Sequence, residues 1–517
     1  MKHRVKNIMN FFDKELWNNN KKYCSGCYAC YSVCPQNCIS MCTDEEGFNY
    51  PCIDESICVN CGLCERICPI NILSKLGNIP IDAYAVINNK TEERLNSSSG
   101  GIFCLLAEYV NSQRGVVFGA KFDGEFNVVH DFAEEVEDLS VFYGSKYVQS
   151  VIGDTYITAK TFLEKGKFVL FSGTPCQIAG LKAFLGKDYD NLWTVDVLCH
   201  GVPSPKVWKK YISYHRTMKG MDIEKVSFRD KKFGWNMFSM VLQFTDESLY
   251  RKVMLEDMYM QGFLKNLYLR ASCYNCKFKG EVRFGDVSLG DFWGIDAIFP
   301  ELNDDKGVSL LLLNSIKGQK MLQVISEAVE LKQTPMEALT KYNSVAVNSV
   351  EEPSQRSEFF KDLKKLEAGE LFLKYCKYYC ETDMRAKMLL IERRLKENHP
   401  CIVQAFVQHF SNIDKGIYLW GSGRYGEMMS QYLQKHGIKV KAFIDNNMEK
   451  VGQVINGVQI ISFTELKDAD ANIFVAVASC EISESIKEQV NNKYQSINIL
   501  TFDRLYGYKS IKGLLWE

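Results

Sequence analysis

Cysteines are the residues of this chain whose type and spacing could do chemistry, because eight of them form two runs of one pattern, Cys-x2-Cys-x2-Cys-x3-Cys-Pro. The first run comprises Cys24, Cys27, Cys30 and Cys34, and the second comprises Cys58, Cys61, Cys64 and Cys68. Thiolates at this spacing bind [4Fe–4S] clusters. Structural zinc sites use pairs of cysteines or cysteine–histidine mixtures instead. Disulfide frameworks are typical of small secreted domains, not of a 517-residue chain. The pattern therefore predicts two clusters.

The doubled pattern resembles that of bacterial two-cluster ferredoxins, in which the fourth cysteine of each run binds the cluster of the other run. That resemblance assigns the first cluster to Cys24, Cys27, Cys30 and Cys68, and the second to Cys58, Cys61, Cys64 and Cys34. Cys38, Cys42 and Cys52 lie inside the same segment but outside the pattern. We expect these three to be small apolar side chains near the clusters.

Four cysteines in the middle of the chain fall on three loops that could meet at one edge of a sheet. Cys176 and Cys199 each follow a short apolar run and precede a helical pattern. Such tandem units predict parallel strands, and open α/β sheets hold their ligands at the C-terminal ends of those strands. Cys273 and Cys276 form a Cys-x2-Cys pair further along. We expect these four thiolates to hold a third [4Fe–4S] cluster, with a zinc site or unrelated thiols as the alternatives.

A loop of serines and glycines precedes the helical pattern IFCLLAEYVN and could bind an anion. It contains Ser98, Ser99, Gly100 and Gly101. The first turn of a helix presents backbone N–H groups that have no partner within the helix, and such groups bind phosphate. Serine is also a common helix N-cap residue, so a purely structural cap is the alternative.

A second glycine-rich turn lies near the C-terminus, between a predicted strand and a predicted helix. Gly421, Gly423 and Gly426 form the pattern G-x-G-x-x-G, and Asp445 ends the following strand. In dinucleotide-binding folds an acidic residue at about this distance binds a ribose hydroxyl. The pattern predicts a nucleotide or nucleotide-sugar site, and a fold that has lost its ligand is the alternative.

These motifs divide the chain into a multidomain protein of the α/β and α+β classes. The N-terminal part is expected to be a ferredoxin-like 2[4Fe–4S] module, the centre an α/β domain, and the C-terminal part a Rossmann-like domain. The expected boundaries are a lead-in at 1–20, the ferredoxin domain at 21–75, the central domain at 80–350, a helical linker at 352–410 and the Rossmann-like domain at 411–517.

Composition excludes several classes of function. A formal net charge of −1 provides no general attraction for nucleic acid or acidic lipid. No apolar run reaches the roughly 18 residues needed to span a membrane, and no secretory signal pattern follows the basic start. Clusters and free thiolates need a reducing setting, so we expect a cytoplasmic protein.

Residues 21–350 resemble the beta subunit of coenzyme F-420-reducing hydrogenase and its relatives, which include ferredoxin-dependent chlorophyll and chlorophyllide reductases. The motifs that carry the resemblance are the Ser-Ser-Gly-Gly loop, Gly144-Ser145-Lys146-Tyr147, Gly173-Thr174-Pro175-Cys176-Gln177, Cys199-His200-Gly201, Cys273-x-x-Cys276 and Gly290-Asp291-Phe292. The C-terminal hundred residues lie outside it. They look similar to small Rossmann-like domains of bacterial sugar-modifying and glycan-biosynthesis proteins.

The resemblance implies an FAD near the central cluster and suggests a role for each motif. The Ser97–Gly101 loop would cradle the flavin pyrophosphate, and Lys146 would neutralise phosphate or reduced-flavin charge. The flavin ring would be lined by Gly173, Thr174, Gln177 and Gly201. His200 would donate a proton to the substrate, with a hydrogen-bonded loop histidine as the alternative. Arg229 and Lys231 would meet an anionic substrate group unless they lie on a solvated hairpin.

The expected function is an oxidoreductase that reduces a small organic substrate with electrons from ferredoxin or another electron-transfer protein. A flavin would join the two halves, because clusters pass single electrons and flavins exchange one or two. One alternative is an electron-transfer subunit that links a deazaflavin or nicotinamide to a larger redox complex. Others are a redox protein of glycan biosynthesis and a simple electron carrier or sensor.

Overall fold

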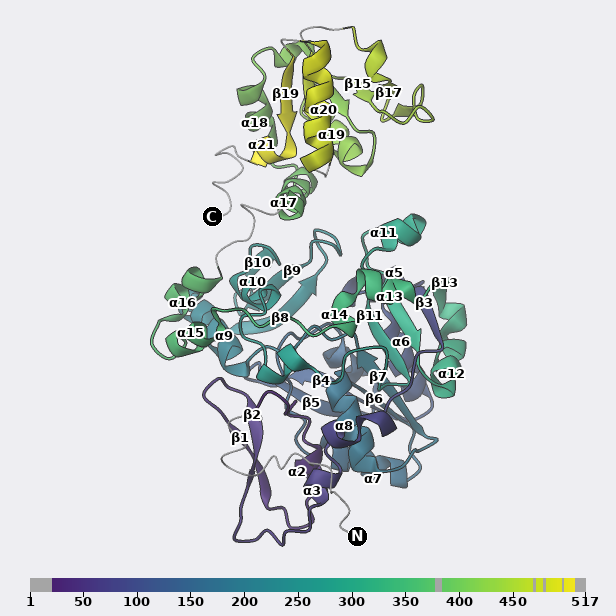
Figure 1. Cartoon of the computed structure of the whole chain (residues 1–517), viewed down its shortest axis with the longest axis vertical. Coiled ribbons are helices and arrows are strands. Elements are labelled where there is room, and N and C mark those ends of the chain that lie inside the picture. Colours follow the sequence, from purple (N-terminus) through teal and green to yellow (C-terminus); the bar gives the residue numbers. More distant parts are fainter. Residues whose placement is uncertain (1–20, 377–383, 468–470, 478–479, 495–496, 507–517) are drawn as a thin grey trace, which may run out of the picture. The chain divides into compact units, whose positions relative to one another are not determined.

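The computed structural model describes residues 21–376, 384–467, 471–477, 480–494 and 497–506. The predicted lead-in at 1–20 lies outside them. The chain forms two compact units, Met1–Lys377 and Tyr378–Glu517 (Figure 1). No helix among the described residues is long and apolar enough to cross a membrane.

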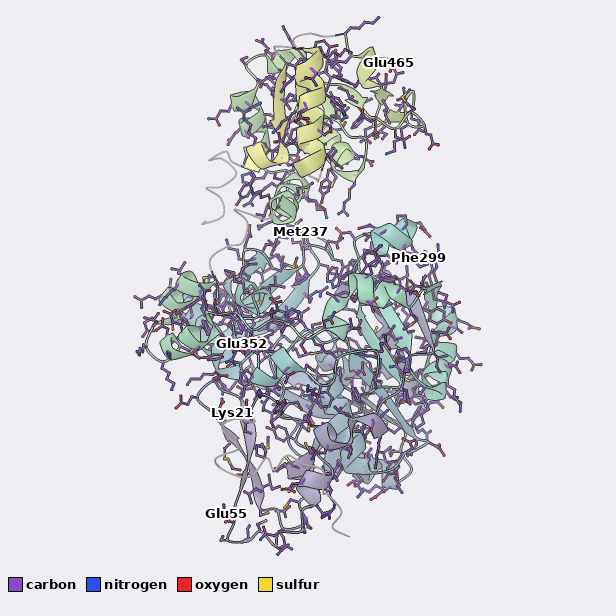
Figure 2. All side chains as sticks on the ribbon, in the orientation of Figure 1. Lys21, Glu55, Met237, Phe299, Glu352 and Glu465 are labelled. Carbon is purple, nitrogen blue, oxygen red and sulfur yellow. A yellow bond between two sulfur atoms is a disulfide. The ribbon has the colours of Figure 1, made fainter. Side chains whose placement is uncertain are left out.

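The ferredoxin-like module is a two-stranded hairpin with short helices that carry the cysteine runs. Its elements are α2 (Ala29–Val33), β1 (Ile39–Thr43), β2 (Asn49–Ile53), α3 (Leu63–Arg66) and α4 (Pro69–Ile72). Strands β1 and β2 are antiparallel. Tyr28 and Gly62 have left-handed backbones directly before α2 and α3, which turns the chain sharply within each run. Both α2 and α4 contact α8 (Pro175–Leu185) of the central domain, and Figure 2 labels Lys21 and Glu55 at opposite ends of the module.

The central domain is built on a mixed sheet of eight strands in the order β13-β3-β12-β11-β7-β6-β4-β5. Strands β4, β6, β7 and β11 are parallel neighbours, and the strands on either side of them are antiparallel. The strands are β3 (Asp82–Asn88), β4 (Val116–Phe122), β5 (Val128–Ala133), β6 (Val169–Gly173), β7 (Leu192–Val197), β11 (Val287–Asp291), β12 (Ser309–Leu313) and β13 (Val329–Thr334).

Helices cover both faces of this sheet because its strands are apolar on both sides. On β4, Val117 packs with α6 (Ile102–Ser112) and α12 (Ile316–Ile325). Phe118 faces the other way and packs with α7 (Thr155–Glu164) and α8. Burial on both faces is typical of parallel strands. The predicted α/β class is confirmed.

A smaller antiparallel sheet of three strands accompanies the main one. It consists of β8 (Ile223–Asp230), β9 (Ser239–Phe244) and β10 (Leu249–Val253). Its apolar face shares a core with α9, α10, α15 and α16. These helices span Pro205–Lys219, Met258–Leu264, Arg356–Asp362 and Ala368–Tyr375.

The segment 352–410, predicted as a helical linker, is helical where it is described but is divided between the two units. Helices α15 and α16 pack in the first unit through buried residues such as Phe359 and Phe372. Helices α17 (Met384–Lys396) and α18 (Cys401–His409) pack in the second unit, where α17 contacts α19 (Arg424–Lys435). Apolar faces on both pairs of helices explain why each joins a core.

The second unit is a Rossmann-like sheet in the order β16-β17-β15-β14-β18-β19. All neighbours are parallel except the edge pair β16–β17. The strands are β14 (Ile417–Trp420), β15 (Val440–Ile444), β16 (Val454–Ile455), β17 (Val458–Ile461), β18 (Asn472–Val475) and β19 (Asn498–Thr501). The further helices are α20 (Cys480–Lys493) and α21 (Phe502–Tyr506).

Candidate iron–sulfur and cofactor sites

The four cysteines assigned to the first cluster line one cavity of the ferredoxin-like module. They are Cys24, Cys27, Cys30 and Cys68, and Cys64, which was assigned to the second cluster, lines the same cavity. Cys68 comes from the second run, as the ligand exchange between runs requires. Burial raises the pKa of Cys27 and of Cys68 to about 12. Thiols held in this way stay protonated until a metal centre takes the place of the proton, so the cavity fits a thiolate-bound cluster.

The second group of cysteines includes one residue that sequence reasoning missed. The sulfur of Cys38 lies 3.3 Å from that of Cys34, and hydrogen bonding to Cys34, burial and Cys58 together raise the pKa of Cys38 to about 12. Cys34 and Cys58, both assigned to the second cluster, therefore meet at Cys38. The sequence signal that could have identified Cys38 is its position four residues after Cys34.

Cys42 and Cys52 form a disulfide across the β1–β2 hairpin. The expectation that they are small apolar side chains near the clusters is wrong for this pair. The reason lies in strand pairing, because Ser40 pairs with Cys52 and Cys42 with Tyr50. The two cysteines are thus diagonal neighbours on one face of the hairpin, within reach of each other.

The four central cysteines also line a single cavity. Cys176 lies in the first turn of α8, which begins with a capping box formed by Thr174 and Gln177. Cys199 follows β7, and Cys273 and Cys276 lie in and directly after the 3-10 helix Ala271–Asn275. Three segments distant in sequence thus meet beside the C-terminal ends of β6 and β7. This juxtaposition is the one that the strand–loop–helix pattern predicts.

Two of the central cysteine sulfurs have hydrogen-bonding partners on neighbouring residues. The backbone N–H of Val202 donates to Cys273 Sγ at 3.4 Å, and Thr174 Oγ1 lies 3.1 Å from Cys176 Sγ. Burial raises the pKa of all four thiols, to about 12 for Cys176 and Cys273. Hydrogen bonds to sulfur stabilise bound clusters. Among the described residues, no three Cys, His, Asp or Glu side chains are grouped to hold a single metal ion.

The serine–glycine loop meets the Gly144–Tyr147 motif. The backbone N–H of Ser145 donates to Ser98 Oγ at 2.6 Å, and the Ser145 hydroxyl donates to it at 2.9 Å. Gly100 is needed for packing, since a Cβ there would lie 2.4 Å from the Val86 carbonyl oxygen. Its N–H donates to Ser309 Oγ at 2.9 Å. Part of this loop is therefore committed to the protein's own strands.

Three cations stand around this loop. Arg229 donates to the Ser98 carbonyl at 3.1 Å and pairs with Asp291 at 2.8 Å. Lys231 donates to the Ser99 carbonyl at 2.8 Å. Arg229 and Lys231 are 5% and 8% exposed, so a solvated hairpin is excluded for them. The Nε of Arg229 is buried and has no hydrogen-bond partner in the described part of the chain.

Burial lowers the pKa of Lys146, the third of these cations, to about 7. Its ammonium donates to the carbonyls of Tyr143 and Gly144 at 3.1 and 3.2 Å. Burial and the neighbouring Arg229 likewise lower the pKa of Lys231 to about 7. A lysine whose pKa is lowered by burial binds an anion readily, because the anion stabilises the protonated form that burial disfavours.

The residues predicted to line the flavin ring lie near the central cysteines. Gly201 lines the cavity itself, Gln177 Nε2 donates to Ser150 Oγ at 2.8 Å, and a Cβ on Gly173 would lie 3.2 Å from Gln177. His200 Nε2 lies 2.6 Å from Asn266 Oδ1, and burial lowers the pKa of His200. His200 therefore has the contacts of a hydrogen-bonded loop histidine, which was the alternative to its role as a proton donor.

The C-terminal glycine-rich turn closes on its own acidic residue. Ser422 donates to Asp445 through its backbone N–H at 3.0 Å and through its hydroxyl. The backbone N–H of Asn447 donates to the other carboxylate oxygen at 3.0 Å. Burial opposes this charge, but these hydrogen bonds lower the pKa of Asp445 overall. Asp445 is thus already engaged in holding the turn.

Two glycines of this turn should respond differently to alanine. A Cβ on Gly426 would lie 2.0 Å from the Gly421 carbonyl oxygen, whereas a Cβ on Gly423 meets nothing within 4 Å. Gly426→Ala is expected to destabilise the second unit by about 3 kcal/mol, and Gly423→Ala by much less. Hydrogen exchange of the full chain, read over 413–499, measures both. Equal protection in the two variants would contradict the geometry.

Family comparisons agree with the sites. Residues 23–72 match the 4Fe-4S dicluster domain, 166–338 match the C-terminal region of the coenzyme F420 hydrogenase/dehydrogenase beta-subunit family, and 413–499 match the C2185-like N-terminal family. A solved chain of the F420-reducing [NiFe] hydrogenase complex from Methanosarcina barkeri, in a xenon-derivatised form, is 15% identical with a TM-score of 0.37. The match covers 52% of this chain and 88% of that one. At this TM-score the likeness supports no conclusion, and no curated protein matches the sequence.

The cysteine sites and the dicluster match define the chain as an iron–sulfur redox protein. More particularly, residues 166–338 are similar to the C-terminal region of the coenzyme F420 hydrogenase/dehydrogenase beta-subunit family. The resemblance drawn from the sequence motifs is thereby confirmed.

Proposed function

We propose that this protein is an iron–sulfur flavoprotein oxidoreductase with three [4Fe–4S] clusters and an FAD. It passes electrons between ferredoxin, or another electron-transfer protein, and a small organic substrate, in a cytoplasmic setting. The observation that carries the proposal is the close approach of two cysteine sites. A Cβ on Gly180 of α8 would lie 2.9 Å from Cys27 Cβ, and the same helix carries Cys176 in its first turn.

In this packing Cys27, a proposed ligand of the first cluster, lies against the helix that carries Cys176, a proposed ligand of the central cluster. Electrons that enter the ferredoxin-like module would therefore reach the central cluster without leaving the protein interior. Cys176 and Cys199 follow β6 and β7, and the cationic group around Ser98 and Ser99 belongs to the same domain. A cluster exchanges single electrons, whereas a bound flavin exchanges one or two and so can serve a two-electron substrate.

The residues around the serine–glycine loop fit an anionic cofactor. Arg229, Lys231 and Lys146 are cations at least partly removed from water, and one carboxylate, Asp291, pairs with Arg229. The unpartnered Nε of Arg229 is a donor left over for a ligand. A pyrophosphate would supply the missing negative charge. We therefore place the FAD phosphates at Ser98 and Ser99, with Lys146 beside them.

Anaerobic purification with iron, sulfide and flavin analysis tests the proposal. Three clusters give about twelve irons per chain, and acid should release FAD. A value of about eight irons, accompanied by zinc, would replace the central cluster with a structural zinc site. Failure to bind FAD after anaerobic reconstitution would remove the flavin.

FAD binding should take up protons at Lys146. In the free protein its pKa is about 7, so the amine is increasingly neutral above that pH. The phosphate charge raises the pKa on binding, so FAD affinity should fall as pH increases from about 7 toward the unperturbed value of about 10. Calorimetry in buffers of different ionisation enthalpy measures this uptake. Lys146→Met should abolish it and Lys187→Met, an exposed control, should not; a pH-independent affinity in the unmodified protein would contradict the assignment.

The family match favours a second candidate, an electron-transfer subunit that links a deazaflavin or nicotinamide to a larger redox complex. The two candidates differ in what reduces the bound flavin. Rapid flavin reduction by reduced F420 or NAD(P)H, with none from ferredoxin, would select the second. A role in glycan biosynthesis would instead require a nucleotide-sugar at the Gly421–Gly426 turn, which thermal-shift screening of the full chain with nucleotide-sugars can detect.

A further inference from the structure

Arg270 lies between the first cysteine cavity and the central one. Its side chain has no exposed surface and lines the central cavity. Its Nε donates to the carbonyl of Cys24 at 2.8 Å, and Nη2 lies 3.8 Å from Cys24 Sγ. Its own carbonyl accepts the N–H of Cys273 at 2.8 Å. One residue thus contacts a predicted ligand of each cluster.

The charge of Arg270 has no carboxylate partner among the described residues. Nη1 donates to Gln149 Oε1 at 2.8 Å, Nη2 donates to the Asn49 carbonyl at 2.9 Å, and the guanidinium lies 4.0 Å from the Tyr50 ring centre. Every other buried arginine of the described chain pairs with Asp or Glu; these are Arg94, Arg229, Arg283, Arg356 and Arg394.

A buried cation without a counter-charge is strongly destabilising. Arg270 contacts Cys24 through its guanidinium and Cys273 through its backbone carbonyl, and both cysteines belong to groups that become anionic when clusters bind. Gly26 leaves room for this contact, since a Cβ there would lie 2.8 Å from Arg270 Nη1. The positive charge of Arg270 is therefore balanced only when clusters are bound on both sides of the guanidinium.

We propose that Arg270 is the shared counter-charge of the first ferredoxin-type cluster and the central cluster, and that it sets the reduction potentials of both. Adding an electron makes each cluster more negative, and a fixed positive charge beside it favours that step. Because the same guanidinium lies beside both clusters, it makes the reduction of each cluster more favourable. Arg270 is a positioning residue for the ligand loops as well. This proposal rests on the three-cluster function proposed above.

Redox titration monitored by electron paramagnetic resonance tests it. We expect Arg270→Gln to make one-electron reduction of both clusters at least tenfold less favourable, about 59 mV per tenfold change. The potential of the second ferredoxin-type cluster should not move. Arg270→Lys keeps the charge and should show a smaller shift.

Arg94→Gln is the matched control. Arg94 is also buried, but it pairs with Asp304 at 2.6 Å and lines neither cysteine cavity. It should leave all three potentials unchanged. Wild-type potentials in either Arg270 variant with full iron content would overturn the proposal, as would loss of both clusters in both variants, since Arg270 would then be structural only. Absence of a third cluster in the unmodified protein would instead overturn the proposed function.

Discussion

Replacement of Cys176 by serine is expected to remove the central cluster, and with it about four irons per chain. The ferredoxin-like clusters should remain, because the predicted ligands of the first cluster line a cavity of their own. Flavin reduction by ferredoxin should fall by more than about 100-fold, since even disturbing the surroundings of a metal site costs up to that much. Iron analysis and stopped-flow flavin absorbance measure the two effects.

Cys376→Ser is the control for this experiment. Cys376 is a buried thiol in the same unit, 3% exposed, and it packs at Gly262 and Tyr268 rather than at a cysteine cavity. It should keep the full iron content and the rate of flavin reduction. Full iron content in the Cys176 variant would show that the four cysteines do not bind a cluster.

The fourth cysteines of the two runs should differ in their sensitivity to mutation, although the sequence makes them equivalent. Cys68→Ser is expected to lose the first cluster, about four irons. Cys34→Ser should retain most of the second cluster, because the sulfur of Cys38 lies 3.3 Å from that of Cys34 and can take its place. Cys34→Ser combined with Cys38→Ser should lose it. Iron content and low-temperature resonance spectra distinguish the three variants.

Cys38→Ser alone is the reference for this comparison, and it should keep both clusters. Equal iron loss in the Cys34 and Cys68 single variants would show that Cys38 cannot act as a ligand. Electron transfer from ferredoxin to flavin should be lower in the Cys68 variant, since the first cavity adjoins α8 and the central cysteines.

Local sequence was sufficient where the chemistry depends on neighbours along the chain. Cysteines three and four residues apart in a tight turn must project toward one point, so the two runs predicted the cysteine cavity of the ferredoxin-like module. The strand–loop–helix pattern predicted that Cys176 and Cys199 lie at one sheet edge. Periodicity also predicted helices between 352 and 410, but it does not say which core an amphipathic helix joins.

The sequence by itself determined what this protein can bind: the number, type and spacing of its cysteines specify iron–sulfur chemistry and the domains that hold it. Only the tertiary structure decided how the sites are joined. Arg270 and Cys24 are 246 residues apart, and Arg229 and Ser98 are 131 apart. Spacing cannot predict such pairs, because they depend on how whole domains pack and on which buried charges are left without a partner. Strand pairing within the ferredoxin-like module, rather than domain packing, joined Cys42 to Cys52.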